Sequence, residues 1–149
     1  MFTNNYQAIL ERMCTGNDSP SAMNKTTVNT SVREGYAPVY IEKSSPKIQL
    51  GAGTTHPKKT DYVLETPIDA ALYDATFTYQ STKDFSNENS YSQFFTSVTN
   101  KSSEQLIVNE CGLFVSVSGN TFMIAHEVFD TPKIFAPGET KSFVWKVFY

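Results

Sequence analysis

The chain has 149 residues, enough for one ordinary domain to bury a core without help from metals or disulfides. Its 12 Lys and Arg against 15 Asp and Glu give a formal net charge of -3, which offers no bulk attraction to a polyanion and argues against nucleic acid as a partner. No apolar run approaches the roughly 20 residues of a membrane span, and the first residues lack the basic start and apolar middle of a signal peptide. We therefore expect a chain that is made and kept soluble, with no membrane partner.

The first 33 residues are predicted to form one short helix followed by an extended arm. Residues 4–13 carry apolar side chains at helical spacing behind an Asn cap, and residues 15–33 are rich in Asn, Ser and Thr with few large apolar side chains. We predict that residues 1–33 form a helix and docking arm, and that residues 34–149 form the folded domain. Such a segment cannot bury enough surface alone and would become ordered on a neighbouring subunit. Its candidate assembly residues are Phe2, Tyr6, Ile9, Leu10 and Met13.

The rest of the chain is dominated by short β-favouring segments. Aromatic residues make up 13% of the chain and charged residues only 18%, which is typical of a β-rich protein with a polar surface. Strands are predicted over residues 37–42, 48–51, 72–80, 91–100, 106–118, 122–127 and 143–148. This pattern predicts an all-β fold, an antiparallel β-sandwich or a jelly-roll-like arrangement, with a short N-terminal helix.

Turn residues separate the last strands. Gly119 and Asn120 predict a two-residue hairpin turn, and residues 129–139 read as a connection that ends in a Pro-Gly turn with Pro137 at its second position. The alternation of apolar residues in these strands predicts a core of Leu106, Val108, Leu113, Val115, Phe122, Ile124, Phe143, Trp145 and Val147.

Residues that could carry chemistry are few. His56 and His126 stand outside any metal-ligand spacing, and His126 cannot share an ion with Glu127 because neighbouring strand residues face opposite ways, so both are read as ordinary surface or hairpin histidines. Residues 51–55 contain two glycines but lack the Gly-Lys-Ser/Thr of a phosphate-binding loop, and they read as a turn whose glycines relieve backbone strain. Cys14 and Cys111 are read as free thiols, with Cys111 packed in an apolar strand. We predict no catalytic residue, no metal site and no cofactor.

One glutamate and two tyrosines could have a role other than packing in the core. Glu110 lies between apolar residues of one strand, so its carboxylate is expected to be partly buried and to need backbone N–H or basic partners. Tyr73 and Tyr91 could contribute to an aromatic platform for a glycan, although aromatic residues on strands also serve as core or interface.

Four segments resemble small virion proteins of tailed bacteriophages, and they follow one another in the same order as in that group. They are the opening Met-Phe-Thr-Asn-Asn-Tyr, the stretch Leu-Gly-Ala-Gly-Thr-Thr-His-Pro-Lys-Lys-Thr-Asp-Tyr over 50–62, Asn-Glu-Cys-Gly-Leu-Phe over 109–114, and Phe-Ala-Pro-Gly-Glu over 135–139. The family-like pattern has an aliphatic residue where Cys111 stands and an arginine where His126 stands, which puts a salt bridge from position 126 in doubt.

The resemblance implies a non-enzymatic β-sandwich that is made in the cytoplasm of the bacterial host and assembles in several copies on the virion. Tail, collar, fibre and capsid-decoration roles all stay open, and other virion proteins would be its partners. The alternative is a carbohydrate- or receptor-binding β-sandwich module that contacts a host-surface glycan. A hydrolase on the same scaffold would need a paired acid and base in one pocket, and the sequence names no such pair.

Overall fold

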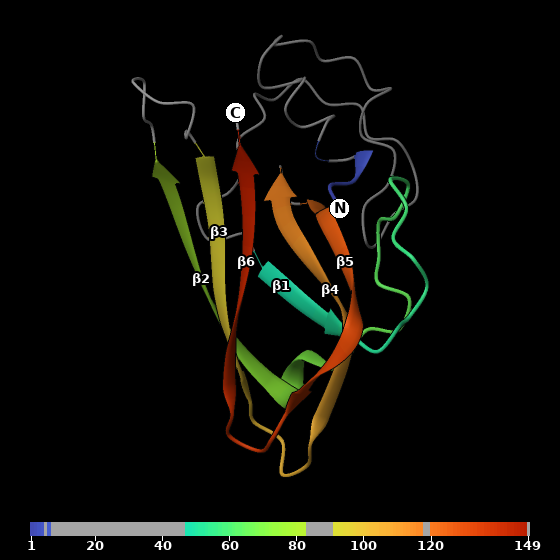
Figure 1. Ribbon diagram of the computed structural model, residues 1–149, viewed down its shortest axis with the longest axis vertical. Helices are drawn as coiled ribbons and strands as arrows, with labels where there is room; N and C mark the ends of the chain where they lie inside the picture. The colour runs from blue at the N-terminus through green and yellow to red at the C-terminus, as the bar shows by residue number, and fades with distance from the viewer. Residues whose placement is uncertain (5, 7–46, 83–90, 118–119, 149) are drawn as a thin grey trace, which may run out of the picture. The chain divides into compact units, whose positions relative to one another are not determined.

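The computed structural model describes residues 1–4, 6, 47–82, 91–117 and 120–148. These residues form two antiparallel sheets of three strands, ordered β1-β4-β5 and β2-β3-β6 (Figure 1). The strands are β1 (Lys47–Gly51), β2 (Tyr73–Thr82), β3 (Tyr91–Asn100), β4 (Leu106–Val117), β5 (Asn120–Phe135) and β6 (Thr140–Phe148), with one short 3-10 helix at Ala70–Leu72. The predicted all-β, antiparallel fold class is therefore confirmed.

The predicted strands match the observed ones closely, with one correction. Strand β5 runs to Phe135, so residues 129–135 are strand and not the connection that the sequence predicted. Their polar composition misled the prediction, because β5 lies at the edge of its sheet, where exposed polar residues and Pro132 are tolerated. The Pro-Gly turn follows as predicted: Glu139 N donates to Ala136 O at 3.0 Å, and Gly138 has a φ of 76°.

Several sequence predictions fall outside the described residues. They are the strand at 37–42, the arm at 15–33, the boundary between residues 33 and 34, and most of the helix at 4–13. Of the predicted hairpin turn, Gly119 lies outside and Asn120 begins β5. Among the described residues, no helix is long and apolar enough to cross a membrane.

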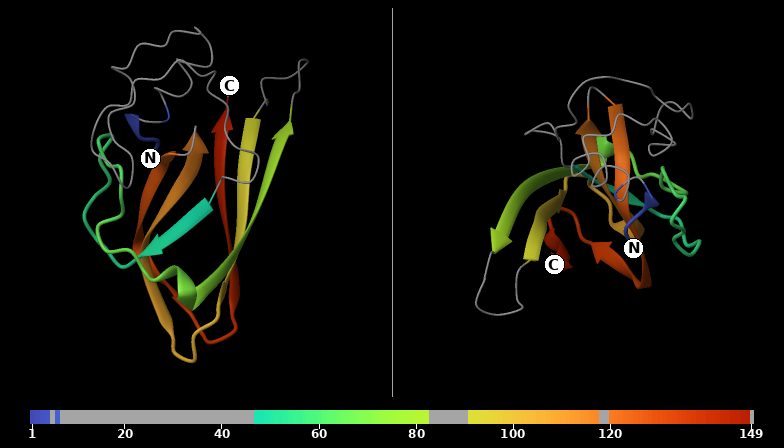
Figure 2. Two further views of the ribbon diagram at one scale, coloured as in Figure 1. Left: turned by 180° about the vertical axis from the view of Figure 1, so that it is seen from behind. Right: turned by 90° about the horizontal axis from the view of Figure 1, so that it is seen from above.

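The chain divides into two compact units, and β4 and β5 each run from one into the other. Unit 1 comprises Met1–Ile68 and Val108–Lys133, and unit 2 comprises Asp69–Ile107 and Ile134–Tyr149. In unit 1, the loop that follows β1 runs alongside β5, as both the front view (Figure 1) and the view from behind (Figure 2) show.

Unit 1 buries its central strand on both faces. All five residues of β4 from Cys111 to Val115 are buried, although the sequence assigned only the odd-numbered ones to the core. The second face is covered by the loop after β1, since Leu64 packs with Phe114 and Met123 in one apolar cluster. Burial on both faces explains why this strand reads as a nearly continuous apolar run.

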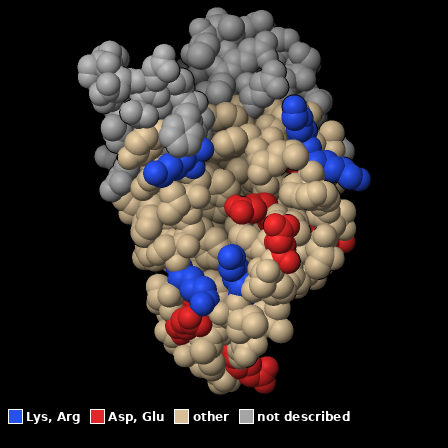
Figure 3. Space-filling model, in the orientation of Figure 1, with Lys and Arg blue, Asp and Glu red and all other residues tan. Residues whose placement is uncertain are grey.

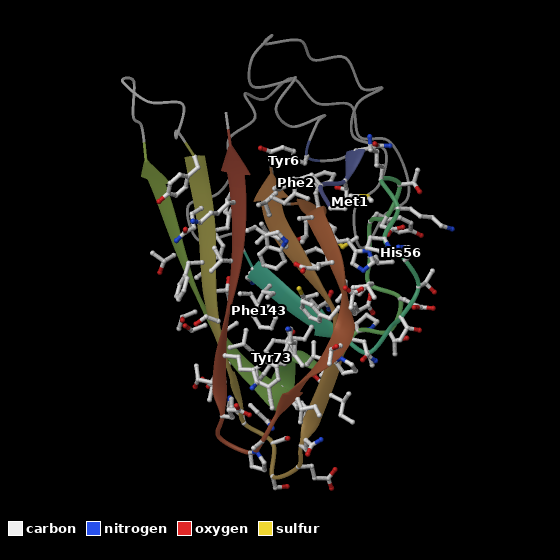
Figure 4. The ribbon with its side chains drawn as sticks, viewed as in Figure 1. Met1, Phe2, Tyr6, His56, Tyr73 and Phe143 are labelled. Carbon is white, nitrogen blue, oxygen red and sulfur yellow. The ribbon has the colours of Figure 1, made fainter. Side chains whose placement is uncertain are left out.

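Unit 2 keeps the two-residue alternation of a sheet with one buried face. On β3, Thr96, Val98 and Asn100 are buried, and Thr96 lies opposite the buried Phe143 of β6. The Phe143 ring, labelled in Figure 4, stacks on Phe135 at 6.2 Å between ring centroids. The predicted core residues are all buried except Val147, whose side chain lies outside the described part of the chain.

Candidate functional site

The loop over residues 52–68 leaves β1 and returns to its side. Its backbone and side chains form the hydrogen bonds from which the candidate site of unit 1 is built. Ala52 N donates to Thr66 O and Ile68 N donates to Leu50 O, both at 2.8 Å, so the two ends of the loop are joined. Within the loop, the Glu65 carboxylate accepts hydrogen bonds from Thr54 N, Thr55 N and the Thr55 hydroxyl at 2.7–2.9 Å. These bonds hold the pKa of Glu65 below its ordinary value, with the Thr55 hydroxyl as the largest cause.

Glu110 of β4 anchors this loop to the sheet. Its side chain is fully buried, and Oε1 accepts from Gly53 N at 3.0 Å and from Thr66 N at 2.8 Å. Oε2 accepts from Glu65 N at 3.1 Å and lies 2.9 Å from His126 Nε2. A carboxylate has about four acceptor positions, so its capacity is filled. The predicted burial of Glu110 and its need for backbone N–H and basic partners are confirmed.

The glycines of the 51–55 segment are required by this carboxylate. A Cβ atom added at Gly51 would lie 2.4 Å from Glu110 Oε1, and one added at Gly53 would lie 2.5 Å from the same atom. Neither glycine has a φ in the left-handed region. The interpretation that these glycines relieve backbone strain is therefore wrong: they allow the backbone to approach a buried acid closely.

His126 of β5 completes an acid–His–acid cluster, which we define as Asp61, His126 and Glu110. The imidazole is 4% exposed, and its Nδ1 lies 2.8 Å from Asp61 Oδ2. The sequence-based reading of His126 as an ordinary surface or hairpin histidine is corrected, because the loop delivers Asp61 from 65 residues away to cover the ring. At position 126, the ring nitrogens lie 2.8 Å and 2.9 Å from carboxylate oxygens, which is the geometry of a salt bridge for a protonated ring.

The hydrogen bonds of the cluster occupy both nitrogens of the imidazole. Nδ1 of His126 faces a carboxylate oxygen of Asp61, and Nε2 faces one of Glu110. Asp61 Oδ2 also accepts from Lys58 N at 2.7 Å. With both nitrogens engaged, His126 has none left to take a proton from a substrate.

A pocket of about 310 Å³ opens beside the cluster in unit 1. It is lined by Thr55, His56, Lys58, Asp61, Val63, Leu64, Glu65 and His126, of which Figure 4 labels His56. Among the described residues, no group of three or more His, Cys, Asp or Glu side chains is arranged to hold a metal ion. Asp61 and Glu65 were missed by sequence reasoning, since nothing in their local pattern marks them as partners of residues on β4 and β5.

Two of the five candidate assembly residues, Phe2 and Tyr6, are described, and they belong to unit 1. Phe2 forms an antiparallel bridge with Ala125 of β5, and its ring lies 4.4 Å from that of Tyr6 (Figure 4). Thr3 N donates to Ile124 O, and His126 N donates to Met1 O. Residues 1–4 thus extend the sheet beyond β5, whereas Ile9, Leu10 and Met13 lie outside the described residues.

The two tyrosines considered for glycan contact are not brought together. Tyr73 pairs with Asn100 at one end of the β2–β3 ladder, and Tyr91 pairs with Thr82 at the other end. Tyr73 is only 6% exposed, while Tyr91 is half-buried with Lys146 Nζ 4.8 Å from its ring centroid. They cannot form one aromatic platform within a single copy.

Cys111 is fully buried and forms no disulfide, so the expected packing role is confirmed. Burial, followed by the nearby Glu127 carboxylate, raises the pKa of its thiol well above the ordinary value. Such a thiol is a poor nucleophile at neutral pH, because the thiolate is the reactive form.

On the face drawn in Figure 3, the acidic and basic side chains of the described residues form small separate groups. Comparison of the chain with protein-family models, with curated proteins and with solved structures found no match.

Proposed function

We propose that this chain is a non-enzymatic structural protein of a tailed bacteriophage virion, in the tail, collar, fibre or capsid, and that it acts through subunit contacts. One observation carries the proposal: the acid–His–acid cluster uses its buried polar atoms to hold the chain's own loop. Glu110 accepts three backbone N–H bonds from that loop, and His126 is held between two carboxylates. The proposal draws its virion part from the resemblance of four sequence segments.

An enzyme would need a base with an open nitrogen or oxygen and a nucleophile or water site within its reach. The His126 ring bonds only to Asp61 and Glu110 among the described residues, and no hydroxyl or thiol there is hydrogen-bonded to it. The Cys111 thiol is buried and held in its neutral form. These features favour a structural role for the titratable groups of unit 1.

The first experiment follows the native particle. In lysates of the source cells, we expect peptides of this chain to co-sediment with intact tailed particles and to remain with them after a high-salt wash. The wash is needed because weakly bound charged proteins dissociate as salt screens their contacts. A chain found only in the unsedimented fraction would overturn the virion proposal.

The second experiment tests self-association by light scattering over a concentration series. Deleting residues 1–33 would also remove residues 1–4 from β5, so a loss of assembly could not be assigned to the predicted docking side chains. We therefore compare the wild type with a triple variant, Ile9→Ser, Leu10→Ser and Met13→Ser, which keeps residues 1–4. A smaller oligomer in the variant supports the docking arm, and an unchanged mass rejects it.

A further inference from the structure

The two sheets have four edge strands, and three of them are protected. In unit 1, residues 1–4 cover β5 at residues 124–126, and β5 carries Pro132 and Lys133 further along. Strand β1 is only five residues long, and the end of the loop covers it at Gly51. In unit 2, β6 carries Lys141 and Lys146, and lysines on an edge discourage further pairing.

Strand β2 lacks these protections among the described residues. It is ten residues long, contains no Pro or Gly, and carries one charged residue, Asp74, near its first end. Ala75, Thr76 and Thr78 are exposed, and Phe77 is half-buried. A long edge strand that is accessible and carries polar but mostly uncharged side chains is a template for pairing with another strand.

The alternation of hydrogen bonds along β2 shows which of its backbone N–H and C=O groups face β3 and which face the outer edge of the sheet. Lys101 N donates to Leu72 O at 2.9 Å, and these two residues directly flank the Tyr73–Asn100 pair that ends the β2–β3 register. Directly opposed residues of an antiparallel pair alternate between bonded and non-bonded. The even-numbered residues of β2 therefore bond to β3, while the N–H and C=O groups of Ala75 and Phe77 point away from β3, toward the edge of the sheet.

We propose that β2 pairs with β2 of a second copy of this chain, antiparallel and about a twofold axis, so that two three-stranded sheets join into one. A twofold arrangement satisfies both open edges at once, because each copy offers the same backbone groups. With the two strands overlapping over most of their length, the Asp74 carboxylates lie at opposite ends of the pair and do not face each other. This interface rests on the proposed function, for which it supplies a specific subunit contact.

Amide hydrogen exchange tests the contact without any substitution. In the joined sheet, the Ala75 and Phe77 amides become hydrogen-bonded, so their exchange should slow by about tenfold or more as protein concentration rises. The Thr76 amide is the internal control, because it already bonds to β3. If light scattering shows an oligomer while the Ala75 and Phe77 amides stay unprotected, the edge contact is overturned and the virion proposal stands.

Ala75→Pro provides the matched mutational test. It removes only the outward N–H and should leave the β2–β3 ladder bonds in place, whereas Ala75→Thr keeps that N–H. We expect Ala75→Pro to halve the particle mass and Ala75→Thr to leave it unchanged. A folded Ala75→Pro variant with the wild-type mass overturns the contact, as does a wild type that is monomeric at every concentration. If the Ala75→Pro variant does not fold, the hydrogen exchange of the Ala75 and Phe77 amides in the wild type decides whether the β2–β2 contact forms.

Discussion

Glu110 Oε2 on β4 lies 2.9 Å from His126 Nε2 on β5, and both side chains are buried. The contact joins neighbouring strands of the sheet, and it is extended by Asp61 on the far side of the imidazole. The cluster thereby fastens a 17-residue loop to two strands at a site where a small apolar core alone would leave backbone N–H groups without partners. Its main physical consequence is stability, which the following predictions address.

Glu110→Ala should destabilise the fold by roughly 3–5 kcal/mol, because it leaves three backbone N–H groups and the His126 ring buried without their acceptor. The free energy of unfolding from urea titration measures this loss. Glu104→Ala, at an exposed glutamate, is the control and should change that free energy by less than about 0.5 kcal/mol. Equal losses in the two variants would show that the cluster contributes little.

Gly51→Ala should destabilise the protein by about 1–3 kcal/mol, since its new Cβ would overlap the Glu110 side chain. The three nearest atoms to that Cβ all belong to Glu110. In a Glu110→Ala background, the same substitution should therefore cost much less. A double-mutant cycle by urea titration measures this coupling, and additive losses would contradict the close approach.

Glu65 should contribute to stability above pH 4.5 and lose that contribution in acid. Its folded pKa is lowered, chiefly by the Thr55 hydroxyl, so the unfolded chain takes up its proton first as pH falls. The stabilisation is fully present at neutral pH and declines as pH falls through the ordinary value of 4.5 toward the lower folded value. Unfolding free energies of wild type and Glu65→Gln should thus converge as pH falls from 6 to 3, and parallel curves would contradict the prediction.

Cys111 should resist thiol reagents in the native state and react once the chain unfolds. Burial raises its pKa, so the folded protein keeps the proton that the unfolded chain releases, and stability should fall as pH rises above the ordinary value of 9.0. Labelling in a Cys14→Ser background isolates this thiol, with urea as the positive control. Rapid labelling of the native protein would place Cys111 at the surface.

Trp145→Ala should cost roughly 3–5 kcal/mol, because Trp145 is buried on the core face of β6. Its neighbour Val144 points to the other face of the same strand and is 46% exposed. Val144→Ala is the control, and it should cost less than about 1 kcal/mol in the same urea titration. A loss below 1 kcal/mol for Trp145→Ala would reverse the face assignment.

The all-β class and much of the core could be read from the sequence. Alternating apolar residues and turn residues act locally, so the strands over 91–100 and 106–117 and the turn at Pro137 were predicted close to where they lie. Polar stretches gave a weaker signal, and the second half of β5 was therefore missed. The buried state of Glu110 followed from its apolar neighbours along the strand.

The partners of Glu110 were decided only by the tertiary structure. The loop with Asp61 and the donating amides is one segment, and Glu110 on β4 and His126 on β5 are two others; their meeting depends on how the loop folds back over β4 and β5. No local periodicity encodes such a meeting, so the sequence showed His126 as an ordinary histidine and the glycines at 51 and 53 as turn residues. The sequence by itself determined which residues form strands, whereas long-range packing determined that one buried carboxylate needs two glycines, a loop and a histidine around it.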